Sequence, residues 1–497
     1  MKLHKALLCA AFWWFFPGAQ AAEVDHAVEA ALAARGAADV LILLDDQARP
    51  ALSPLSPTAA PRLRRRALVE ALRDRAALQQ AALGDWLAAR GVAHRRFWLV
   101  NAIQASIGPA ELAALSTREG VARIAANPSI ALRLAPASVP GLRPAATTGV
   151  EWGVAKIRAP EAWAAGVTGQ GVVIGGQDTG YQWDHPALKA QYRGWNGGSV
   201  SHARSWHDAI HPGAPANNCG YDAPAPCDDN GHGTHTAGTF AGDDGGANQI
   251  GVAPGARWIG CRNMAAGNGT PATYIECMQW FLAPTDPAGN DPDPDYAPDI
   301  ISNSWGCPAS EGCTVGNELA GAVQTLVEAG IFFAAAAGND GSTCGSILDA
   351  PATYDASFVV GATTATDAIT GFSSRGPVAG AAAARPDVIA PGSGVRSAVP
   401  GNAYSSKSGT SMATPHVAGA AALVMSANPA LKGHPQQVAA LLRATAVRSG
   451  ITDPYRTSCG GLSLGTWPNH QAGWGRIDAW AAVQAATPDV FSDGFEG

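Results

Sequence analysis

The segment Gly409-Thr410-Ser411-Met412-Ala413-Thr414-Pro415-His416-Val417-Ala418-Gly419 decides how the rest of this chain is interpreted. It places a serine directly before an apolar run whose pattern predicts a helix over Met412 to Ser426. Amide groups at a helix N-terminus favour negative charge, which suits a serine that forms an anionic intermediate. Pro415 is compatible with this helix because we expect it in the first turn, where no amide hydrogen bond is lost. The segment therefore predicts that Ser411 is a nucleophile at the start of a helix.

Two further segments supply the groups that a serine nucleophile needs. Gln177-Asp178-Thr179-Gly180 follows an apolar strand pattern, and His232-Gly233-Thr234-His235 opens a helical one. A serine hydroxyl attacks when a base such as imidazole takes its proton, and a buried carboxylate holds that imidazole in the right tautomer. The order Asp, His, Ser along the chain differs from the order in chymotrypsin-like enzymes and in α/β-hydrolases. We interpret Asp178, His232 and Ser411 as a catalytic triad.

A fourth segment, Ala336-Ala337-Gly338-Asn339, ends another apolar strand pattern. The side-chain amide of Asn339 is suited to donate a hydrogen bond to an oxyanion, and the backbone amide of Ser411 would be the second donor. We therefore expect an oxyanion hole made of Asn339 and Ser411.

Each of these residues also has an ordinary structural interpretation. An isolated Asp-Thr-Gly is often only a turn, a histidine at a helix start can be a cap or a core residue, and Ser411 can be an N-cap. Asn339 can occupy a turn beside glycines. We interpret His235 and His416, which lie in the same motifs, as packing residues. The joint occurrence of all four motifs favours catalysis over these separate explanations.

Strand and helix patterns alternate from Val150 onward, which is typical of a mainly parallel sheet covered by helices on both faces. The expected strands are Gly171 to Gly176, Pro298 to Asn303, Ile331 to Ala336 and Phe358 to Gly361. The expected helices are Thr270 to Leu282, Asn317 to Glu328, Met412 to Ser426 and Pro435 to Ala446. The fold class is therefore α/β.

With these motifs the chain resembles the subtilisin family of serine peptidases over nearly all of Val150 to Thr487, and it is most similar to the bacillopeptidase F branch. The segments that carry this similarity are Val150-Glu151-Trp152, Ala159-Pro160-Glu161-Ala162-Trp163, Tyr192-Arg193-Gly194-Trp195-Asn196, Asn248-Gln249-Ile250-Gly251-Val252-Ala253-Pro254-Gly255, Leu282-Ala283-Pro284 and Asn303-Ser304-Trp305-Gly306. The resemblance implies a subtilisin-like three-layer α/β/α fold. It also implies an endopeptidase that hydrolyses peptide bonds in proteins through an acyl-enzyme on Ser411, without an organic cofactor.

The resemblance also implies how a protein or peptide substrate binds. Ser304, Trp305 and Gly306 would form a strand edge that pairs with the substrate backbone; a buried strand end is the alternative. Asp349 precedes a segment that lines the S1 pocket in the family, and a carboxylate there would favour Lys or Arg at P1. An exposed or salt-bridged Asp349 is the other interpretation.

Metal binding is not assigned to any residue. Many members of the family bind a structural calcium ion through an Asp just before a Leu, after the catalytic Asp, and this chain has Ala187 in that position. Calcium has a second possible site in an acidic loop, because carboxylate oxygens suit this ion; a solvated surface loop is the favoured interpretation. The acidic residues of that loop are Asp286, Asp291, Asp293, Asp295 and Asp299.

The N-terminus has the pattern of a secretory signal peptide. Lys2 and Lys5 precede an apolar run over Ala6 to Phe16, and small residues at Ala19 and Ala21 predict cleavage after Ala21. A membrane anchor is the alternative, but the run is about half of the roughly 20 residues that span a bilayer. We expect a signal peptide over 1–21 and a secreted monomer that passes through the periplasm, with no nucleic-acid or membrane partner.

Residues 22–135 differ in character from the rest of the chain. Their net charge is about +3, whereas residues 136–497 carry about −12, which favours electrostatic docking of the two parts. The first part has a β-α-β-α-β pattern and resembles, loosely, the inhibitory propeptide of the family, a small α+β (ferredoxin-like) domain. We expect a propeptide over 22–135, a cleavable linker over 136–149, a peptidase domain over 150–487 and a C-terminal tail over 488–497.

The cysteines fit an oxidising compartment. Nine are present, and removal of Cys9 with the leader leaves an even number. Cys219 with Cys227 and Cys307 with Cys313 are close in sequence, so local disulfides are expected there. The pairing of Cys261, Cys277, Cys344 and Cys459 stays open.

Two rival functions belong to other classes. The first is a catalytically silent secreted binding protein on the same fold, which the intact catalytic positions disfavour. The second is a serine esterase or lipase, which would place its serine in Gly-x-Ser-x-Gly, ahead of Asp and His in the sequence. Ser411 instead comes last and lies in Gly-Thr-Ser-Met-Ala. The composition, with 47% hydrophobic and 15% charged residues, is that of a globular protein.

Overall fold

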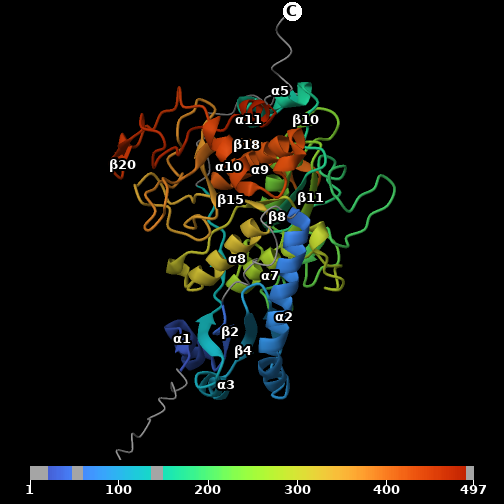
Figure 1. The fold of residues 1–497 in the computed structure, drawn as a ribbon, viewed down its shortest axis with the longest axis vertical. Helices are drawn as coiled ribbons and strands as arrows, with labels where there is room; N and C mark the ends of the chain where they lie inside the picture. The colour runs from blue at the N-terminus through green and yellow to red at the C-terminus, as the bar shows by residue number, and fades with distance from the viewer. Residues whose placement is uncertain (1–20, 48–59, 136–148, 488–497) are drawn as a thin grey trace, which may run out of the picture.

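The structure, a computed structural model, describes residues 21–47, 60–135 and 149–487. Almost all of the predicted signal peptide and linker, and the whole predicted tail, therefore lie outside the described residues. Figure 1 shows a small unit formed by the N-terminal residues below a larger α/β unit. In the described ranges no helix combines the length and the apolar character that crossing a membrane requires.

A seven-stranded sheet lies at the centre of the larger unit, and all neighbouring strands in it are parallel. Its strand order is β17-β16-β15-β14-β8-β11-β9. The strands are β8 (Val173–Asp178), β9 (Trp206–Asp208), β11 (Arg257–Arg262), β14 (Ile300–Asn303), β15 (Phe332–Ala336), β16 (Phe358–Thr363) and β17 (Val388–Pro391). The four strands expected from the sequence are β8, β14, β15 and β16.

Helices cover both faces of this sheet, so the expected three-layer α/β/α fold is confirmed. Successive residues of a strand point to opposite faces, and Ile300 accordingly packs in one core and Ile301 in the other. One face carries α7 (Pro271–Leu282) and α8 (Gly316–Glu328). The other carries α6 (His232–Ala241), α9 (Thr410–Ala427) and α10 (Pro435–Ala444).

Shorter elements complete the larger unit. The helices are α4 (Trp152–Lys156), α5 (Ala159–Ala164) and α11 (Ala479–Ala486). The paired short strands are β7 (Gly149–Val150) with β10 (Asn248–Gln249), β12 (Met264–Ala265) with β13 (Asn268–Gly269), β18 (Val395–Val399) with β19 (Ala403–Lys407), and β20 (Ser458–Cys459) with β21 (Leu462–Ser463).

The sequence pattern missed strands β9, β11 and β17, and β11 shows why. This strand begins and ends with arginine, so it lacks the apolar run of a buried strand. Arg262 is nevertheless fully buried. Its guanidinium makes two hydrogen bonds to the carboxylate of Asp208 on the neighbouring strand β9, at 2.8 and 2.7 Å. A buried charge is tolerated when it is paired in this way.

The small unit has the ferredoxin-like order βαββαβ with one further strand and helix before it, where the sequence pattern predicted β-α-β-α-β. Its elements are β1 (Glu23–Val24), α1 (His26–Arg35), β2 (Ala38–Leu44), α2 (Pro61–Ala88), β3 (His94–Phe97), β4 (Ala102–Ile107), α3 (Pro109–Leu115) and β5 (Val121–Ala126). The sheet order is β1-β5-β2-β4-β3. The pattern did not reveal β1 and α1, and it merged β3 and β4, which pair as an antiparallel hairpin.

The two units share one apolar core and are also joined by charges. Leu68 and Leu72 of α2 belong to the same cluster as Met278 of α7 and Val323 of α8. Ion pairs lie around this cluster, and in one of them Arg66 donates to Asp295 at 2.9 Å. The docking anticipated from the charge difference is therefore present, but burial of apolar side chains accompanies it.

Four disulfides form among the described residues. Cys219–Cys227 and Cys307–Cys313 are the two local pairs expected from the sequence. The pairing that the sequence left open is Cys261–Cys277 and Cys344–Cys459. The last of these joins residues 115 positions apart, which connects the loop after β15 to a C-terminal loop.

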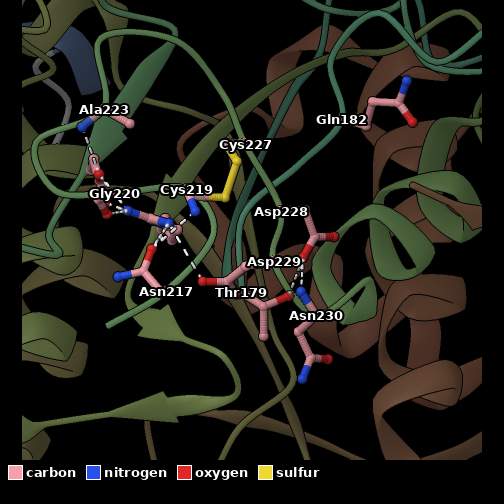
Figure 2. The surroundings of a disulfide bond; sticks show 12 residues. Thr179, Gln182, Asn217, Cys219, Gly220, Ala223, Cys227, Asp228, Asp229 and Asn230 are labelled. Carbon is pink, nitrogen blue, oxygen red and sulfur yellow. Dashed lines mark hydrogen bonds and ion pairs between the residues drawn. A yellow bond between two sulfur atoms is a disulfide. The ribbon is translucent and has the colours of Figure 1, made fainter. Parts of the chain in front are cut away.

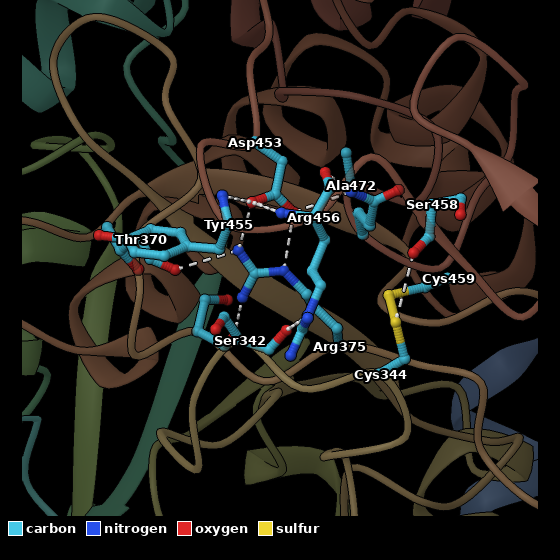
Figure 3. A network of polar contacts seen from close by, with 12 residues as sticks. Ser342, Cys344, Thr370, Arg375, Asp453, Tyr455, Arg456, Ser458, Cys459 and Ala472 are labelled. Carbon is cyan, nitrogen blue, oxygen red and sulfur yellow. Dashed lines mark hydrogen bonds and ion pairs between the residues drawn. A yellow bond between two sulfur atoms is a disulfide. The ribbon is translucent and has the colours of Figure 1, made fainter.

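A buried ion pair supports the same loop after β15 (Figure 3). Arg375 donates two hydrogen bonds to Asp453, at 2.8 and 2.9 Å, and neither side chain is exposed to solvent. The backbone amide of Arg375 donates to the hydroxyl of Ser346, and the Arg456 guanidinium donates to the carbonyl of Ser342, both at 2.9 Å. These contacts fix the path of residues 342–347.

We expect Arg375→Met to lower the free energy of unfolding by about 3–5 kcal/mol, because it leaves the buried carboxylate of Asp453 without its counter-ion. Denaturant unfolding followed by tryptophan fluorescence would measure this, in a Ser411→Ala background that excludes self-cleavage. The control Arg456→Met removes one exposed hydrogen bond, to the carbonyl of Ser342, and should lower the value by about 1 kcal/mol or less. Equal losses in the two variants would contradict a special role for the buried pair.

Candidate active site

Asp178 and His232 form a buried hydrogen-bonded pair. Asp178 is the last residue of β8, and His232 is the first residue of α6. The Nδ1 atom of His232 lies 2.7 Å from Oδ1 and 2.9 Å from Oδ2 of Asp178. The amide of Thr179 donates to the same carboxylate at 2.7 Å. A carboxylate placed in this way fixes the tautomer of the imidazole, with Nδ1 protonated and Nε2 able to accept a proton.

Gly233 lets α6 approach the end of β8 closely enough for this pair to form. A Cβ atom at position 233 would lie 2.1 Å from the carbonyl oxygen of Gly180 and 3.0 Å from the Cβ of Asp178. Both distances are shorter than van der Waals contact. The glycine directly after His232 is therefore a requirement of the site geometry.

Asp228 holds the two motifs together beside the start of α6. Its carboxylate accepts hydrogen bonds from the Thr179 hydroxyl at 2.8 Å and from the Thr234 amide at 3.0 Å. Thr179 follows Asp178, and Thr234 lies on the first turn of the helix that His232 opens, so one side chain connects both segments. Figure 2 shows Asp228 bonded to both Thr179 and the backbone amide of Asn230, near the disulfide Cys219–Cys227. No motif in the sequence includes Asp228.

Ser411 lies in the first turn of α9 and is 4% exposed. Its hydroxyl donates to the carbonyl of Ser304 at 3.2 Å, and the hydroxyl of Ser304 donates to the carbonyl of Ser411 at 3.1 Å. The Nε2 atom of His232 is buried and has no hydrogen-bond partner among the described residues. The hydroxyl of Ser411 thus bonds to Ser304 in this conformation, not to the histidine.

Pro415 lies further inside this helix than expected. The helix begins at Thr410, so the proline is past the first turn and removes an amide that would otherwise bond to the carbonyl of Ser411. The hydroxyl of Ser304 takes the place of that donor. The expectation was therefore wrong, and the missing amide is what allows the contact between Ser304 and Ser411.

Asn339 is held in one orientation after β15. Its Oδ1 atom accepts hydrogen bonds from the amide and the hydroxyl of Thr410, at 3.0 and 3.1 Å. The amide group Nδ2 therefore points the other way, and it donates to the carbonyl oxygen of Arg133 at 3.0 Å. Arg133 lies beyond the end of the small unit's sheet. Asn339 thus binds a main-chain carbonyl, which is the task expected of an oxyanion-hole donor.

The expected substrate-binding residues gather around one pocket. Ser304, Trp305, Gly306 and Asp349 line it together with Asn339 and Ser411, and residues 131–133 of the small unit line the opposite side. Trp305 is 4% exposed and stacks on Tyr274, with ring centroids 3.7 Å apart. The structure thus brings all of the predicted binding residues to the place where Ser411 lies.

A strand edge that the sequence analysis did not name also contributes. The short strand β6 (Ile130–Ala131) pairs antiparallel with β13 (Asn268–Gly269), and the amide of Leu132 donates to the carbonyl of Gly267 at 2.8 Å. Gly267-Asn268-Gly269 has no apolar pattern, so only its position in space reveals that it binds another chain segment.

Asp349 lies in an acidic setting. Its pKa is raised to about 6, mainly because the carboxylate is buried and also because Asp340 and Glu311 lie near it; Arg133 acts in the opposite direction. The guanidinium of Arg133 approaches Asp349 to 3.7 Å. Asp349 is therefore salt-bridged, as in the second interpretation from the sequence, and it also lines the pocket beside Ser411.

His235 and His416 have partners that fit a packing role. His235 Nε2 lies 3.0 Å from the carbonyls of Val395 and Ser405, and His416 Nδ1 lies 2.8 Å from the carbonyl of Met412. Burial lowers the pKa of His235 to about 3 and that of His416 to about 4, so both imidazoles are neutral at pH 7.

No group of three or more His, Cys, Asp or Glu side chains within residues 21–47, 60–135 and 149–487 is arranged to hold a metal ion. In the acidic loop that was considered for calcium, Asp295 pairs with Arg66 and Asp299 with Lys432. Ala187, at the position of the family's calcium ligand, is fully buried.

Comparison with known proteins identifies the family. The model of the subtilase family, peptidase family S8, matches residues 169–475. The chain belongs to the subtilase family. Subtilases are serine endopeptidases, and the matched range contains Asp178, His232, Asn339 and Ser411. The resemblance seen in the sequence motifs is confirmed.

Individual relatives agree with the family match. Bacillopeptidase F of Bacillus subtilis strain 168 is 39% identical over 351 residues, which are 69% of this chain and 22% of the relative, so the chain spans about a fifth of that protein. Subtilisin Savinase of Lederbergia lenta is 34% identical over 307 residues, 62% of this chain and 94% of the relative. Subtilisin E of Bacillus subtilis strain 168 is 32% identical over 282 residues, 56% of this chain and 62% of the relative.

We expect Gly233→Ala to slow the reaction of Ser411 with a fluorophosphonate by about 10²-fold or more, because α6 must move away from Asp178 and displaces His232. The rate of labelling of the purified subtilase would measure this. Gly321→Ala is the matched control, because a Cβ atom there meets open space on helix α8. An unchanged rate in Gly233→Ala would show that the close approach of α6 is not needed.

Proposed function

We propose that this subtilase is a secreted serine endopeptidase that is made as a zymogen and uses Asp178, His232 and Ser411 as its catalytic triad. The observation that carries the proposal is the main-chain carbonyl of Arg133, which is hydrogen-bonded by Asn339 in a pocket that Ser411 also lines. A peptide group of this protein thus occupies the position of a substrate. Protein and peptide substrates would bind in the same way.

The roles of the triad follow from the contacts of each residue. Ser411 attacks the carbonyl carbon of the substrate once its hydroxyl leaves the carbonyl of Ser304, and the unpaired Nε2 of His232 is the base that we assign to it. His232 takes the proton of the hydroxyl and later gives it to the leaving amine. Asp178 holds the imidazole and stabilises its positive charge. An acyl-enzyme forms on Ser411 and is hydrolysed by water.

The oxyanion that develops on the substrate carbonyl would be stabilised from two sides. Asn339 supplies one donor, and its orientation is fixed by Thr410 before substrate binds. The backbone amide of Ser411, in the first turn of α9, supplies the second. Donors that are already oriented need no rearrangement in the transition state, which is why they lower its free energy.

The zymogen part of the proposal rests on residues 22–135. This unit has the ferredoxin-like order, shares an apolar core with α7 and α8, and sends its last described residues into the pocket beside Ser411. While it remains there, a substrate cannot reach Asn339. We propose that it acts as an inhibitory propeptide. Secretion is supported by the leader pattern and by the four disulfides, which are typical of oxidising compartments.

We expect Ser411→Ala and His232→Ala to lower kcat for a casein or peptide substrate by about 10⁴–10⁶-fold and to abolish fluorophosphonate labelling at Ser411. Asp178→Asn should cost about 10⁴-fold, because the imidazole then takes the wrong tautomer. Asn339→Ala should cost about 10²–10³-fold in kcat with little change in KM. Initial rates would measure all four after immobilised wild-type enzyme has cleaved each variant in trans, since the inactive variants are not expected to mature by themselves.

Thermal unfolding of each purified variant would show whether it is correctly folded. If the wild-type protein neither hydrolyses peptides nor reacts with a fluorophosphonate, the chain is a silent binding protein on a subtilase fold, and the proposed function is wrong.

A further inference from the structure

Residues 130–133 lie in the active site as an extended chain. The side chain of Ile130 is fully buried, β6 pairs with β13, and Leu132 donates to Gly267. The amide of Ala131 donates to the carboxylate of Glu311 at 3.0 Å. Addition of a strand to an exposed edge is a common way of binding a peptide, because main-chain hydrogen bonds fix its register.

This register selects one peptide bond. Arg133 is the residue whose carbonyl oxygen receives the hydrogen bond from Asn339 Nδ2. Asn339 and Ser411 line the same pocket, so the carbonyl carbon of Arg133 is the one presented to the serine. The bond after this carbon joins Arg133 to Leu134, whose side chain is exposed.

The side chain of Arg133 enters an acidic site. Its Nε atom donates to Glu311 at 2.8 Å, Nη1 donates to Asp340 at 3.1 Å, and Nη1 lies 3.7 Å from Asp349. Its Nη2 atom also donates to the hydroxyl of Ser310 at 3.1 Å. A guanidinium with its donors directed at several carboxylates is a strong and specific arrangement, because its planar fork matches them.

The acidic residues are held by the larger unit, so the site persists when the small unit leaves. Glu311 lies in the loop closed by the disulfide Cys307–Cys313. Asp340 and Asp349 lie at the two ends of the loop that the ion pair and disulfide of Figure 3 support. Arg133 is 40% exposed, so solvent weakens its ion pairs and the preference they create is moderate.

We propose that the Arg133–Leu134 bond is the bond that this enzyme cuts in its own chain, and that Glu311, Asp340 and Asp349 form an S1 site that selects Arg or Lys in protein substrates. The proposal deepens the proposed function and rests on it. It extends the role that the sequence analysis considered for Asp349 to a group of three carboxylates, and it places the cut just before the linker over 136–149.

The reaction at this bond is ordinary acyl transfer. The Oγ atom of Ser411 bonds to the carbonyl carbon of Arg133, and its proton passes to His232. The bond between that carbon and the nitrogen of Leu134 then breaks, and His232 gives the proton to the new amine. Water releases the acyl group, so the products are a unit that ends at Arg133 and an enzyme that begins at Leu134.

The first experiment follows self-cleavage of the full chain by intact mass spectrometry over time. We expect the first product pair to separate at Arg133–Leu134, and Ser411→Ala to stay uncut. Arg133→Leu should slow this cleavage by about 10–100-fold, whereas Arg133→Lys should cut at the same bond within a few-fold of the wild-type rate. The control Arg90→Leu changes an exposed arginine of the same unit that stacks on Trp86, and its processing should not change.

The second experiment measures kcat/KM of the mature wild-type enzyme for two peptides that differ only in Arg or Leu at P1. The ratio should favour Arg by about 10–100-fold, and Glu311→Gln, Asp340→Asn and Asp349→Asn should each reduce it. Glu311→Gln keeps an oxygen that can accept from the substrate backbone, so its effect reports the charge. The Leu peptide shows that each variant is folded and active.

The outcomes separate this proposal from the proposed function. A first cut at another bond, or a wild-type enzyme that prefers Leu at P1, overturns the inference while labelling at Ser411 and peptide hydrolysis still support a serine endopeptidase. If the wild type shows neither labelling nor hydrolysis, both fall together. Equal processing of Arg133→Leu and wild type would show that the acidic cluster only docks the small unit.

The ratio of the two kcat/KM values should also depend on pH. The groups that face Asp349 are Asp340, Glu311 and the bound cation. The pKa of Asp349 is raised to about 6, so its carboxyl group is mainly neutral below pH 6 and mainly negative above it. The preference for Arg should therefore fall several-fold as the pH decreases from 7.5 to 5. Taking the ratio cancels the ionisation of the catalytic groups, which both peptides share. The ratio for Asp349→Asn should change less over this range, and an identical pH profile in the two enzymes would exclude Asp349.

Discussion

Every functional contact depends on one constraint: strands β8, β14 and β15 run parallel to one another, and the buried helix α9 packs against the sheet that they form. Because the strands run in the same direction, their carboxyl ends meet at one edge, and Asp178, Ser304 and Asn339 lie at or just beyond three of those ends. Helix α9 crosses the same sheet and brings Ser411 to that edge. Ligands commonly bind at this position in open α/β sheets. The site exists because one sheet direction and one buried helix place residues from distant parts of the chain beside each other.

Secondary contacts then refine this arrangement to within hydrogen-bond distance. Asp228 connects the segments of Asp178 and His232, and Thr410 orients Asn339. The hydroxyl of Ser304 donates to the carbonyl of Ser411 the hydrogen bond that Pro415 cannot donate. Asp228, Thr410, Ser304 and Pro415 perform no chemical step in the proposed mechanism. They restrict the conformations of the residues that do, and such preorganisation is a large part of how an enzyme lowers a barrier. The small unit adds a further contact, because the carbonyl of its Arg133 accepts a hydrogen bond from Asn339 in the pocket that Ser411 also lines.

The sequence predicted the fold class, four of the seven strands of the large sheet with its main helices, and the strand or helix end at which Asp178, His232, Asn339 and Ser411 each lie. These predictions succeeded because short-range patterns carry them: apolar runs of strand length, helical periodicity, and motifs of a few residues. It missed β11, in which a buried Arg262 interrupts the apolar pattern, and it merged β3 with β4. It also placed Pro415 in the first turn, because a helix start is difficult to locate to within a few residues.

Other features were decided by tertiary structure alone. Nothing local marks Arg133, which lies far in sequence from Glu311, Asp340 and Asp349, yet the docking of the small unit places its guanidinium among those three carboxylates. The pairing of Cys344 with Cys459 and the strand edge at Asn268–Gly269 likewise depend on contacts between distant segments. The sequence by itself determined that the chain is a subtilase, because the residues that carry the family resemblance lie in short motifs. The tertiary structure decided which main-chain carbonyl lies against Asn339 and which charges surround the neighbouring side chain, since long-range packing sets the distances between segments that the linear order leaves undefined.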